Sequence, residues 1–381
     1  MQRPLRSKQS LSRQLLSWYA KCKRDLPWRR TRDPYKIWVS EIMLQQTQVT
    51  TVIPYYKRFL SSFPTVKVLA RASLQKVLKS WEGMGYYHRA RNLHQAAQVV
   101  IEKWRGKTPS DPKQLETLPS IGRSTAGAIA SIAFGKRAPI LDGNVRRVLC
   151  RLFAIREGLR LPHVQERLWK LSEELLPIRR AGPFNQALME LGATVCLPQR
   201  PMCLLCPLRD QCEAQRLGLQ DQIPIRSSTR PIPHHRIAVG IILKGRSLLM
   251  GPRPDRGLLA GLWGFPEIPA SKTTQDKQAL CQAFSDWTGF ELDLVGLLKP
   301  VIHVYSHRHV TYLPYLFRCQ GGTPSRYYPW QWVRWSQLPS YPFSVATRRM
   351  LDQVKAQRPS TSTEPLPLAA ESPGLYRPYL P

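Results

Sequence analysis

The stretch "LPSIGRSTAGAIA", residues 118–130, carries the pattern that decides the fold of the N-terminal part. A short apolar start leads into a glycine-containing turn, and an alanine-rich helix follows. This pattern predicts a helix–hairpin–helix, in which backbone N–H groups at the start of the second helix bind a DNA phosphate without reading base sequence. An ordinary pair of helices packed across a turn has the same pattern. The motifs elsewhere in the sequence are therefore needed to distinguish the two.

The composition favours a nucleic-acid partner. The 381 residues include 57 Lys and Arg against 25 Asp and Glu, a net charge of +32 that is spread along the chain. A polyanion is the natural partner of such a surface, and a basic surface that is merely solvated is the alternative. We find no apolar run long enough to span a bilayer and no secretory signal, so we do not expect a membrane protein.

Periodicity separates a helical region from a region with strands. Helices are predicted at 9–23, 36–47, 50–61, 73–80, 87–104, 124–134, 143–153, 164–175 and 184–193. Strands are predicted at 236–243, 247–252, 310–319 and 330–335, with helices near 276–288 and 345–356. The predicted organisation is a catalytic region at 1–219, a Pro- and Ser-rich linker at 220–235, an α+β domain at 236–357 and a disordered tail at 358–381.

Upstream of the hairpin, "VSEIMLQQTQV" at residues 39–49 contains Glu41, the only charged residue from Ile37 to Tyr56. Apolar neighbours cover nearly every helical direction, so we expect a buried helix. A carboxylate in such a place needs a partner or a task. A buried ion pair is one explanation. Acid–base chemistry is the other, because apolar surroundings raise the pKa of a carboxyl group.

Downstream, "PILDGNVRRVLCRL" at residues 139–152 places Asp142 directly before a helix. Taken alone, this position predicts an ordinary N-cap. Arg146, Arg147 and Arg151 fit a helix side that faces phosphate, and they fit a solvated side equally well.

Four of the eight cysteines form a compact group with the spacing Cys196-x6-Cys203-x2-Cys206-x5-Cys212. Zinc ribbons usually have two close cysteine pairs, and only one pair is close here. The spacing favours a [4Fe–4S] cluster, with zinc and unligated core cysteines as alternatives. The clustering also indicates a metal site in a reducing compartment rather than a disulfide framework.

Together with "LPWR" upstream and "FNQALMELGATVC" downstream, these motifs resemble the helix–hairpin–helix, iron–sulfur DNA glycosylases, and within them the MutY-type adenine DNA glycosylases. The resemblance is close over roughly residues 10–215 and looser beyond. It implies a mainly α region, a six-helix barrel packed against a cluster-bearing domain, with DNA bound in the cleft. "GLLAGLWGFPE" and "HVYSHRHVTYLPY" look like the family's Nudix-like C-terminal domain. No acidic REx2EE-type helix is present, so we do not expect Mg²⁺-dependent nucleotide hydrolysis.

The resemblance implies roles for two carboxyl groups. Glu41 falls at the catalytic acid, which protonates adenine at N7. Asp142 falls at the carboxylate that stabilises an oxocarbenium-like sugar or attacks it at C1′. Ser124 replaces the lysine of endonuclease III-type relatives, and a hydroxyl group cannot form the imine needed for strand cleavage. Asn144 is expected to support this site.

Further positions follow from the resemblance. The adenine pocket is expected to include Trp28, Arg29, Leu44 and Gln186. Gln46 and Tyr86 are expected to wedge into the duplex, with core packing as the alternative for Tyr86.

The phosphate-binding hairpin is expected to comprise Leu118, Ser120 and Gly122. Ser120 replaces a usual glycine, which is unfavourable if the turn needs a positive φ. Tyr305, Ser306 and His307 are expected to recognise 8-oxoguanine, with a plain strand turn as the alternative.

We therefore expect a monomeric, monofunctional glycosylase that releases adenine opposite 8-oxoguanine or guanine in double-stranded DNA. Its expected cofactor is a [4Fe–4S] cluster and its expected location is the cytoplasm of a bacterium, with the nucleoid. A bifunctional glycosylase/lyase and a non-catalytic iron–sulfur DNA-binding protein are the alternatives.

Overall fold

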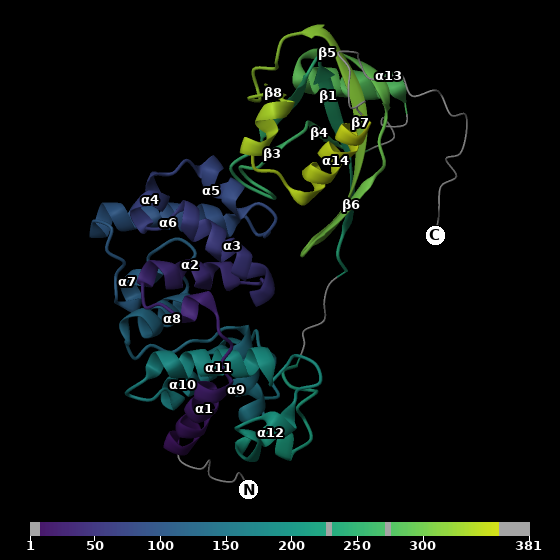
Figure 1. Cartoon of the computed structure of the whole chain (residues 1–381). Coiled ribbons are helices and arrows are strands. Elements are labelled where there is room, and N and C mark those ends of the chain that lie inside the picture. Colours follow the sequence, from purple (N-terminus) through teal and green to yellow (C-terminus); the bar gives the residue numbers. More distant parts are fainter. Residues whose placement is uncertain (1–7, 226–230, 271–275, 358–381) are drawn as a thin grey trace. The chain divides into compact units, whose positions relative to one another are not determined.

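The computed structural model describes residues 8–225, 231–270 and 276–357 (Figure 1). The predicted tail at 358–381 and part of the predicted linker lie outside these ranges. The chain divides into two compact units. The helical unit holds the described residues up to Ala72 and from Arg89 to residue 225, and the C-terminal unit holds Ser73–His88 and the described residues from 231 onward.

The helical unit confirms the predicted mainly α fold. Its helices are α1 (Lys8–Cys22), η1 (Pro27–Arg29), α2 (Pro34–Leu44), α3 (Val49–Ser62), α4 (Val66–Arg71), α6 (His88–Trp104), α7 (Pro112–Glu116), α8 (Arg123–Phe134), α9 (Gly143–Leu152), α10 (Pro162–Leu175), α11 (Ala181–Thr194), η2 (Cys203–Leu205), η3 (Arg209–Gln211) and α12 (Glu213–Arg216). The short helices α4, α7 and α12 were not predicted. Within the described ranges, no helix is both long and apolar enough to cross a membrane.

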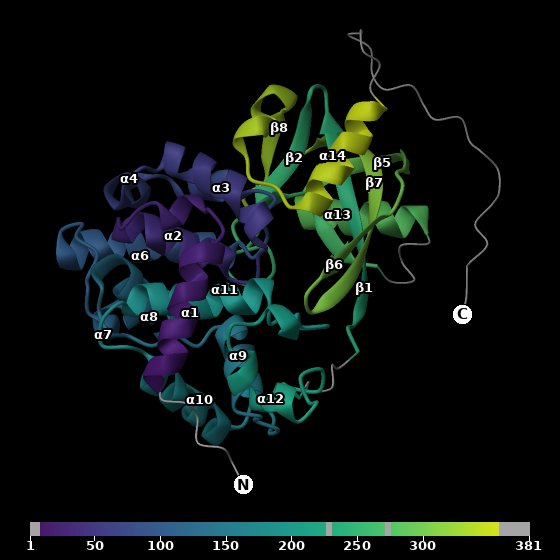
Figure 2. The same cartoon turned by 60° about the horizontal axis from the view of Figure 1, so that its bottom comes forward.

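Glycines let α11 and α8 approach their neighbours closely. α11 lies beside α1, α8 and α9 (Figure 2). A Cβ atom on Gly192 of α11 would lie 2.6 Å from the Cβ atom of Asn144, and a Cβ atom on Gly127 of α8 would lie 2.1 Å from the carbonyl oxygen of Pro139. Only glycine tolerates such distances. These contacts fix the segment around Asp142 against two helices.

The C-terminal unit contains a mixed sheet between two helices, which confirms the predicted α+β fold. Its elements are α5 (Leu74–Trp81), β1 (His234–Lys244), β2 (Ser247–Pro252), β3 (Trp263–Gly264), β4 (Glu267–Pro269), α13 (Lys277–Thr288), β5 (Phe290–Leu297), β6 (Val301–Tyr305), β7 (Arg308–Gly322), β8 (Gln331–Arg334), η5 (Trp335–Ser340) and α14 (Val345–Ala356). The strand order is β3-β2-β1-β7-β5, with β4 on β1, β6 on β7 and β8 on β2.

The central strands β1 and β7 run parallel, and the remaining pairs are antiparallel. Alternating residues of β1 serve two cores. Ala238 and Ile242 pack with Phe284 of α13, whereas Val239 and Ile241 share a core with Met350 of α14. The sheet is therefore buried on both faces.

Candidate active site

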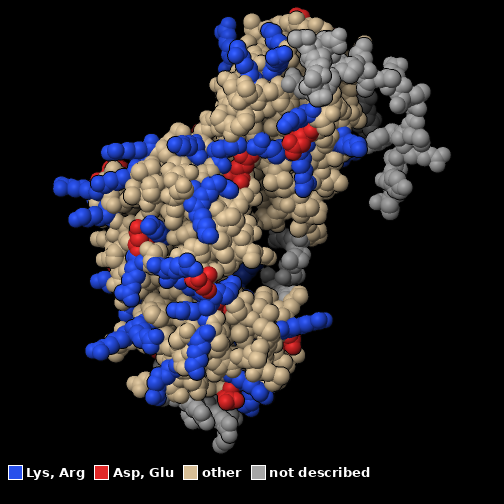
Figure 3. Space-filling model, viewed as in Figure 1, with Lys and Arg blue, Asp and Glu red and all other residues tan. Residues whose placement is uncertain are grey.

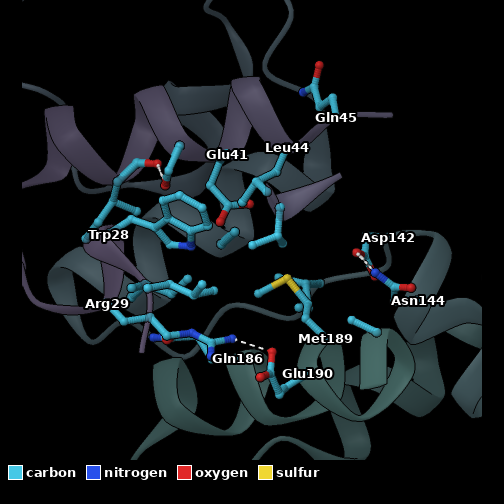
Figure 4. Close-up of a pocket in the computed structure, with 18 of the residues that line it drawn as sticks. Trp28, Arg29, Glu41, Leu44, Gln45, Asp142, Asn144, Gln186, Met189 and Glu190 are labelled. Atoms are coloured by element: carbon cyan, nitrogen blue, oxygen red, sulfur yellow. Dashed lines mark hydrogen bonds and ion pairs between the residues drawn. The ribbon is translucent and has the colours of Figure 1, made fainter. Parts of the chain in front are cut away.

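A pocket of about 600 Å³ lies in the helical unit (Figure 4). It brings together all eight residues that we expected to bind adenine or to act on it. These residues are Trp28, Arg29, Glu41, Leu44, Ser124, Asp142, Asn144 and Gln186. Glu41 and Leu44 project from α2 toward side chains of α11, including Met189 (Figure 4). Residues that are distant in the sequence thus meet in one place.

Glu41 lies on α2, whose first turn is held by Asp33. The Asp33 carboxylate accepts hydrogen bonds from the backbone N–H groups of Tyr35 and Lys36. Burial raises the pKa of Glu41 to about 7, with a further contribution from the negative charge of Asp142 and a smaller opposing one from Arg29. Glu41 therefore holds its proton near neutral pH, as a general acid must.

Asp142 is the N-cap of α9, and it also faces the pocket. Its carboxylate accepts a hydrogen bond of 2.7 Å from the N–H group of Val145 and one of 3.4 Å from the side chain of Asn144. Burial raises the pKa of Asp142, but these donors and the Arg147 charge oppose the rise. Asp142 can therefore be both an N-cap and a functional carboxylate, because the capping hydrogen bonds stabilise its ionised form beside a protonated Glu41.

Ser124 has a positioning role in this structure. Its hydroxyl oxygen accepts a 3.0 Å hydrogen bond from the backbone N–H group of Leu141, the residue before Asp142. The side chain lines the pocket. Ser124 thus ties α8 to the segment that carries the second carboxylate.

Sequence reasoning missed Glu190, which lines the same pocket. The Glu190 carboxylate forms ion pairs with Arg24 at 2.7 Å and with Arg29 at 2.8 Å. Burial alone would raise its pKa, but the hydrogen bonds from Arg24 and Arg29 outweigh burial and lower the pKa to about 2. The acidic residue within the apolar "ALMELG" of α11 was the available signal.

Gln186 is oriented by a second residue that we did not predict. Tyr19 donates a 2.8 Å hydrogen bond to the Gln186 Oε1 atom. Trp28 is buried and meets Tyr56 edge-on, with 5.4 Å between the ring centroids. The predicted pocket residues are therefore held by neighbours on α1 and α3.

Gln46 does not line the pocket and is exposed, in a turn that follows α2. α2 ends at Leu44 instead of the predicted residue 47, because the buried Arg89 binds the carbonyl groups at its C-terminal end. The Arg89 guanidinium donates to the carbonyl oxygens of Ile42 at 3.1 Å and Met43 at 2.8 Å. Gln46 then adopts a φ of 56°.

The predicted hairpin is present between α7 and α8. The Leu118 side chain is buried, and its carbonyl oxygen accepts a 3.1 Å hydrogen bond from the N–H group of Ile121. Ser120 has a φ of 61°, so serine occupies the left-handed region that the usual glycine favours. Asn92 donates a hydrogen bond to its hydroxyl oxygen. Gly122 is the N-cap of α8 and offers no side-chain cap, so the first N–H groups of α8 are open to an anion.

The four cysteines of the 196–212 loop are free thiols, and Cys206 is near enough to the other three to interact with them electrostatically. Burial, and then the neighbouring thiols, raise the pKa of Cys206 to about 12. Among the described residues, no three His, Cys, Asp or Glu side chains converge on one metal ion. A cubane cluster does not require that convergence, because each thiolate binds its own iron atom. The Arg151 guanidinium also donates to the Cys196 sulfur at 3.3 Å.

In the C-terminal unit, Ser306 and His307 form the turn between β6 and β7, and Tyr305 is the last residue of β6. The hydroxyl groups of Tyr305 and the buried Tyr312 lie 2.8 Å apart, and the Tyr305 ring meets His303 at 4.4 Å. Ser306 and His307 are exposed, with 3.4 Å between the Ser306 hydroxyl oxygen and the His307 Nδ1 atom. Tyr305 thus anchors the turn, and the two polar residues are available to a ligand.

Known proteins are similar to this chain in both of its units. Residues 39–174 match the HhH-GPD superfamily of base excision DNA repair proteins, and residues 238–353 match the NUDIX domain. The adenine DNA glycosylase of Homo sapiens is 38% identical over 407 residues, which cover 91% of this chain and 74% of that protein. The adenine DNA glycosylase of Buchnera aphidicola subsp. Acyrthosiphon pisum is 41% identical, with 62% and 68% covered.

Among solved structures, a thermostable thymine-DNA glycosylase is similar with a TM-score of 0.51 and 31% identity. The similarity covers 55% of this chain and 97% of that one.

Proposed function

The chain belongs to the family of adenine DNA glycosylases and is a base excision repair enzyme, and on this premise we propose that it releases adenine paired with 8-oxoguanine or guanine. The observation that carries the proposal is the pair of carboxyl groups in one pocket. Glu41 has a pKa raised to about 7, and Asp142 is held by hydrogen bonds that favour its ionised form. Burial raises the pKa of both groups, but these hydrogen bonds oppose the rise at Asp142, so Glu41 is the one suited to carry the proton.

In the proposed reaction, the flipped adenine enters the pocket and Glu41 transfers its proton to N7. The bond between C1′ and N9 then breaks, and its electron pair leaves with adenine. The Asp142 carboxylate stabilises the positive charge on the sugar, or adds transiently to C1′. Water adds to C1′ and loses a proton to the Glu41 carboxylate, which restores the acid and leaves an abasic site. Ser124 has no amine, so no Schiff base forms.

Other residues that line the pocket are proposed to recognise adenine. Trp28 and Leu44 supply apolar surface, while Gln186, Arg29 and Glu190 supply polar atoms. Tyr19 already occupies one position on the Gln186 carboxamide oxygen, so the amide N–H₂ group is left to face a base acceptor. We expect the Arg29–Glu190 pair to complete the reading of the base edge.

DNA binding rests on the basic surface and on the hairpin. Lys and Arg side chains crowd the visible face of the helical unit, with few acidic side chains between them (Figure 3). The first turn of α8, together with the exposed residues Ser120 and Gly122, is proposed to bind one phosphate. Gln46 and Tyr86 are proposed as wedges. We further propose that the enzyme works as a monomer, in the reducing cytoplasm where its DNA lies.

The four-cysteine loop is proposed to hold a [4Fe–4S] cluster through Cys196, Cys203, Cys206 and Cys212. When bound, the cluster would supply a structural cross-link. The Arg151 and Arg147 side chains donate to Cys196 and to its carbonyl oxygen, so α9 and this loop form one framework. In the C-terminal unit, Ser306 and His307 are proposed to bind 8-oxoguanine.

A strand-cleavage assay tests the proposal. Duplexes that pair adenine with 8-oxoguanine, guanine, cytosine or thymine are incubated with the protein, with and without hot alkali. We expect cleavage only after alkali, and fastest for the first two pairs. Cleavage without alkali would indicate a glycosylase/lyase, and no adenine release from any duplex would refute the proposal.

A further inference from the structure

The segment Ser73–His88 lies within the sequence of the helical region but packs as part of the C-terminal unit. It consists of α5 and the loop that carries Tyr86. Leu78 of α5 is buried, and its side chain would lie 3.2 Å from a Cβ atom on Gly261. The Gln75 side chain donates a 3.3 Å hydrogen bond to the carbonyl oxygen of Ser340. α5 therefore packs as a helix of the C-terminal unit.

An ion-pair bridge ties the end of α5 to α14. The Glu82 carboxylate pairs with Lys79 through one oxygen and with Arg348 of α14 through the other. Glu82 is largely buried, with 17% of its side chain exposed. Lys79 also donates a 3.0 Å hydrogen bond to the carbonyl oxygen of Tyr341. The carboxylate is thus largely shielded from water and has a charged donor at each of its two oxygens.

The loop after Glu82 is held at two more points. The Tyr87 hydroxyl group accepts a 3.0 Å hydrogen bond from the N–H group of Gly83 and donates one of 3.3 Å to the carbonyl oxygen of Phe343. The Trp81 indole donates a 3.1 Å hydrogen bond to the carbonyl oxygen of Gly85. The Arg348 guanidinium lies 5.1 Å from the centroid of the Phe343 ring. Arg348 and Tyr87 thus both contact Phe343, which lies just before α14.

Tyr86 lies at the centre of this loop in an unfavourable backbone conformation. Its φ is 48°, and 36% of the residue is exposed. Side chains with a Cβ atom rarely adopt such a φ unless the surroundings impose it. The contacts of Glu82 and Tyr87 on either side supply that constraint, because they fix both ends of the turn. An exposed aromatic ring in an imposed conformation is suited to insertion between bases.

We infer that Glu82 and Arg348 are positioning residues for Tyr86, so that the C-terminal unit sets the wedge as well as contacting the opposite base. This inference rests on the proposed function, since it assigns Tyr86 to the opening of the duplex. It predicts that the unit contributes to adenine flipping on every adenine mispair, whereas recognition through Ser306 concerns 8-oxoguanine alone.

The test is a double-substitution cycle in the full-length protein. Arg348→Met removes the guanidinium and keeps the aliphatic stem, and Arg348→Lys is the conservative variant expected to restore most of the effect. Arg349→Met is the matched control, because it removes the same charge from the adjacent, exposed residue, whose guanidinium lies 3.5 Å from the Ile302 carbonyl oxygen. Each variant is combined with Tyr86→Ala. Single-turnover adenine release is measured on an adenine:guanine duplex. The fluorescence of 2-aminopurine is measured on a second duplex, in which 2-aminopurine replaces the target adenine opposite guanine.

We expect Arg348→Met to slow adenine release by about fivefold and to reduce the fluorescence rise, within the range of interactions between neighbouring residues. In the Tyr86→Ala background, the same change should have less than about a twofold effect. Equal effects in both backgrounds, or no effect of Tyr86→Ala alone, would overturn the inference. Failure of the wild-type enzyme to release adenine would refute the proposed function instead, so the two failures are distinguishable.

A structural measurement does not depend on activity. Amide hydrogen exchange should become faster across residues 82–88 in Arg348→Met and in Glu82→Gln, and should be unchanged in Arg349→Met. If Arg348→Met does not fold, Glu82→Gln carries the same test. Unchanged exchange in folded variants of both residues would overturn the inference.

Discussion

The active-site pocket and the Tyr86 loop are built in different ways. In the pocket, helix ends and close backbone contacts place the reactive groups: Asp142 is an N-cap, and Gly192 lets α11 approach Asn144. In the Tyr86 loop, residues from a distant part of the sequence supply the constraint, through the side chain of Arg348 and the backbone carbonyl group of Phe343. The carboxyl group of Asp142 is thus placed by backbone geometry, and the proposed wedge is held by contacts with residues far away in the sequence.

The sharpest way to break this comparison is Glu41→Gln. The amide keeps the shape of the side chain but has no acidic proton, so adenine release should fall by more than about 100-fold, the low end for general acid–base catalysis. Duplex affinity should stay near the wild-type value. Single-turnover kinetics and a binding titration check both quantities, and a nearly unchanged rate would remove Glu41 from the mechanism.

The pH dependence tests the same residue without substitution. Burial raises the pKa of Glu41 to about 7, so the acid is protonated and active below this pH and loses its proton above it. The rate of adenine release should therefore fall about tenfold for each pH unit on the alkaline side. Single-turnover rates measured from acidic to alkaline pH check this limb. A flat alkaline profile would show that another group supplies the proton.

A change in the cysteine loop should affect binding more than chemistry. Cys203→Ala removes one expected cluster ligand and should loosen the loop that carries Arg200 and Arg209. Affinity for duplex DNA should weaken by about tenfold, since one charge-assisted hydrogen bond is worth about 1.5–3 kcal/mol and tenfold is about 1.4 kcal/mol. Iron content and visible absorbance should also fall.

Cys22→Ala is the control, because Cys22 is an exposed cysteine outside the loop. Zinc in place of iron in the wild-type protein would overturn the cluster assignment.

The smallest expected effect is that of Ser306→Ala. One hydrogen bond is worth about 0.5–1.5 kcal/mol net, so release opposite 8-oxoguanine should slow by a few-fold. Release opposite guanine should not change, which separates Ser306 from Arg348. Single-turnover rates on the two duplexes give the preference for 8-oxoguanine over guanine. Equal slowing on both duplexes would argue against lesion recognition by this turn.

The sequence predicted the pocket better than the C-terminal unit for physical reasons. Glu41 was identifiable because a single charge in an apolar helix is unusual, and the hairpin was identifiable from its turn. The same logic would have found Glu190, since it also lies among apolar residues. A serine at position 120 was expected to be unfavourable if the turn needed a positive φ, and the φ of Ser120 is positive.

Long-range partners were not predictable from local patterns. The early end of α2 depends on Arg89, which donates to carbonyl groups more than 40 positions away in the sequence. The grouping of Ser73–His88 with the C-terminal unit likewise depends on contacts that no periodicity encodes. The strands β3 to β6 are short or irregular, so their pairing with neighbours, not their composition, defines them.

The Glu82–Arg348 pair also has a consequence for how the chain folds. The two residues are 266 positions apart, and Tyr87 and Phe343 are 256 positions apart. A chain that emerges from the ribosome N-terminus first presents α5 long before its partner α14 exists. Glu82 and Tyr87 cannot make these two contacts until most of the chain has been synthesised. We therefore expect the helical core to form early and the docking of this segment to be among the last steps, because contacts of such sequence separation form slowly.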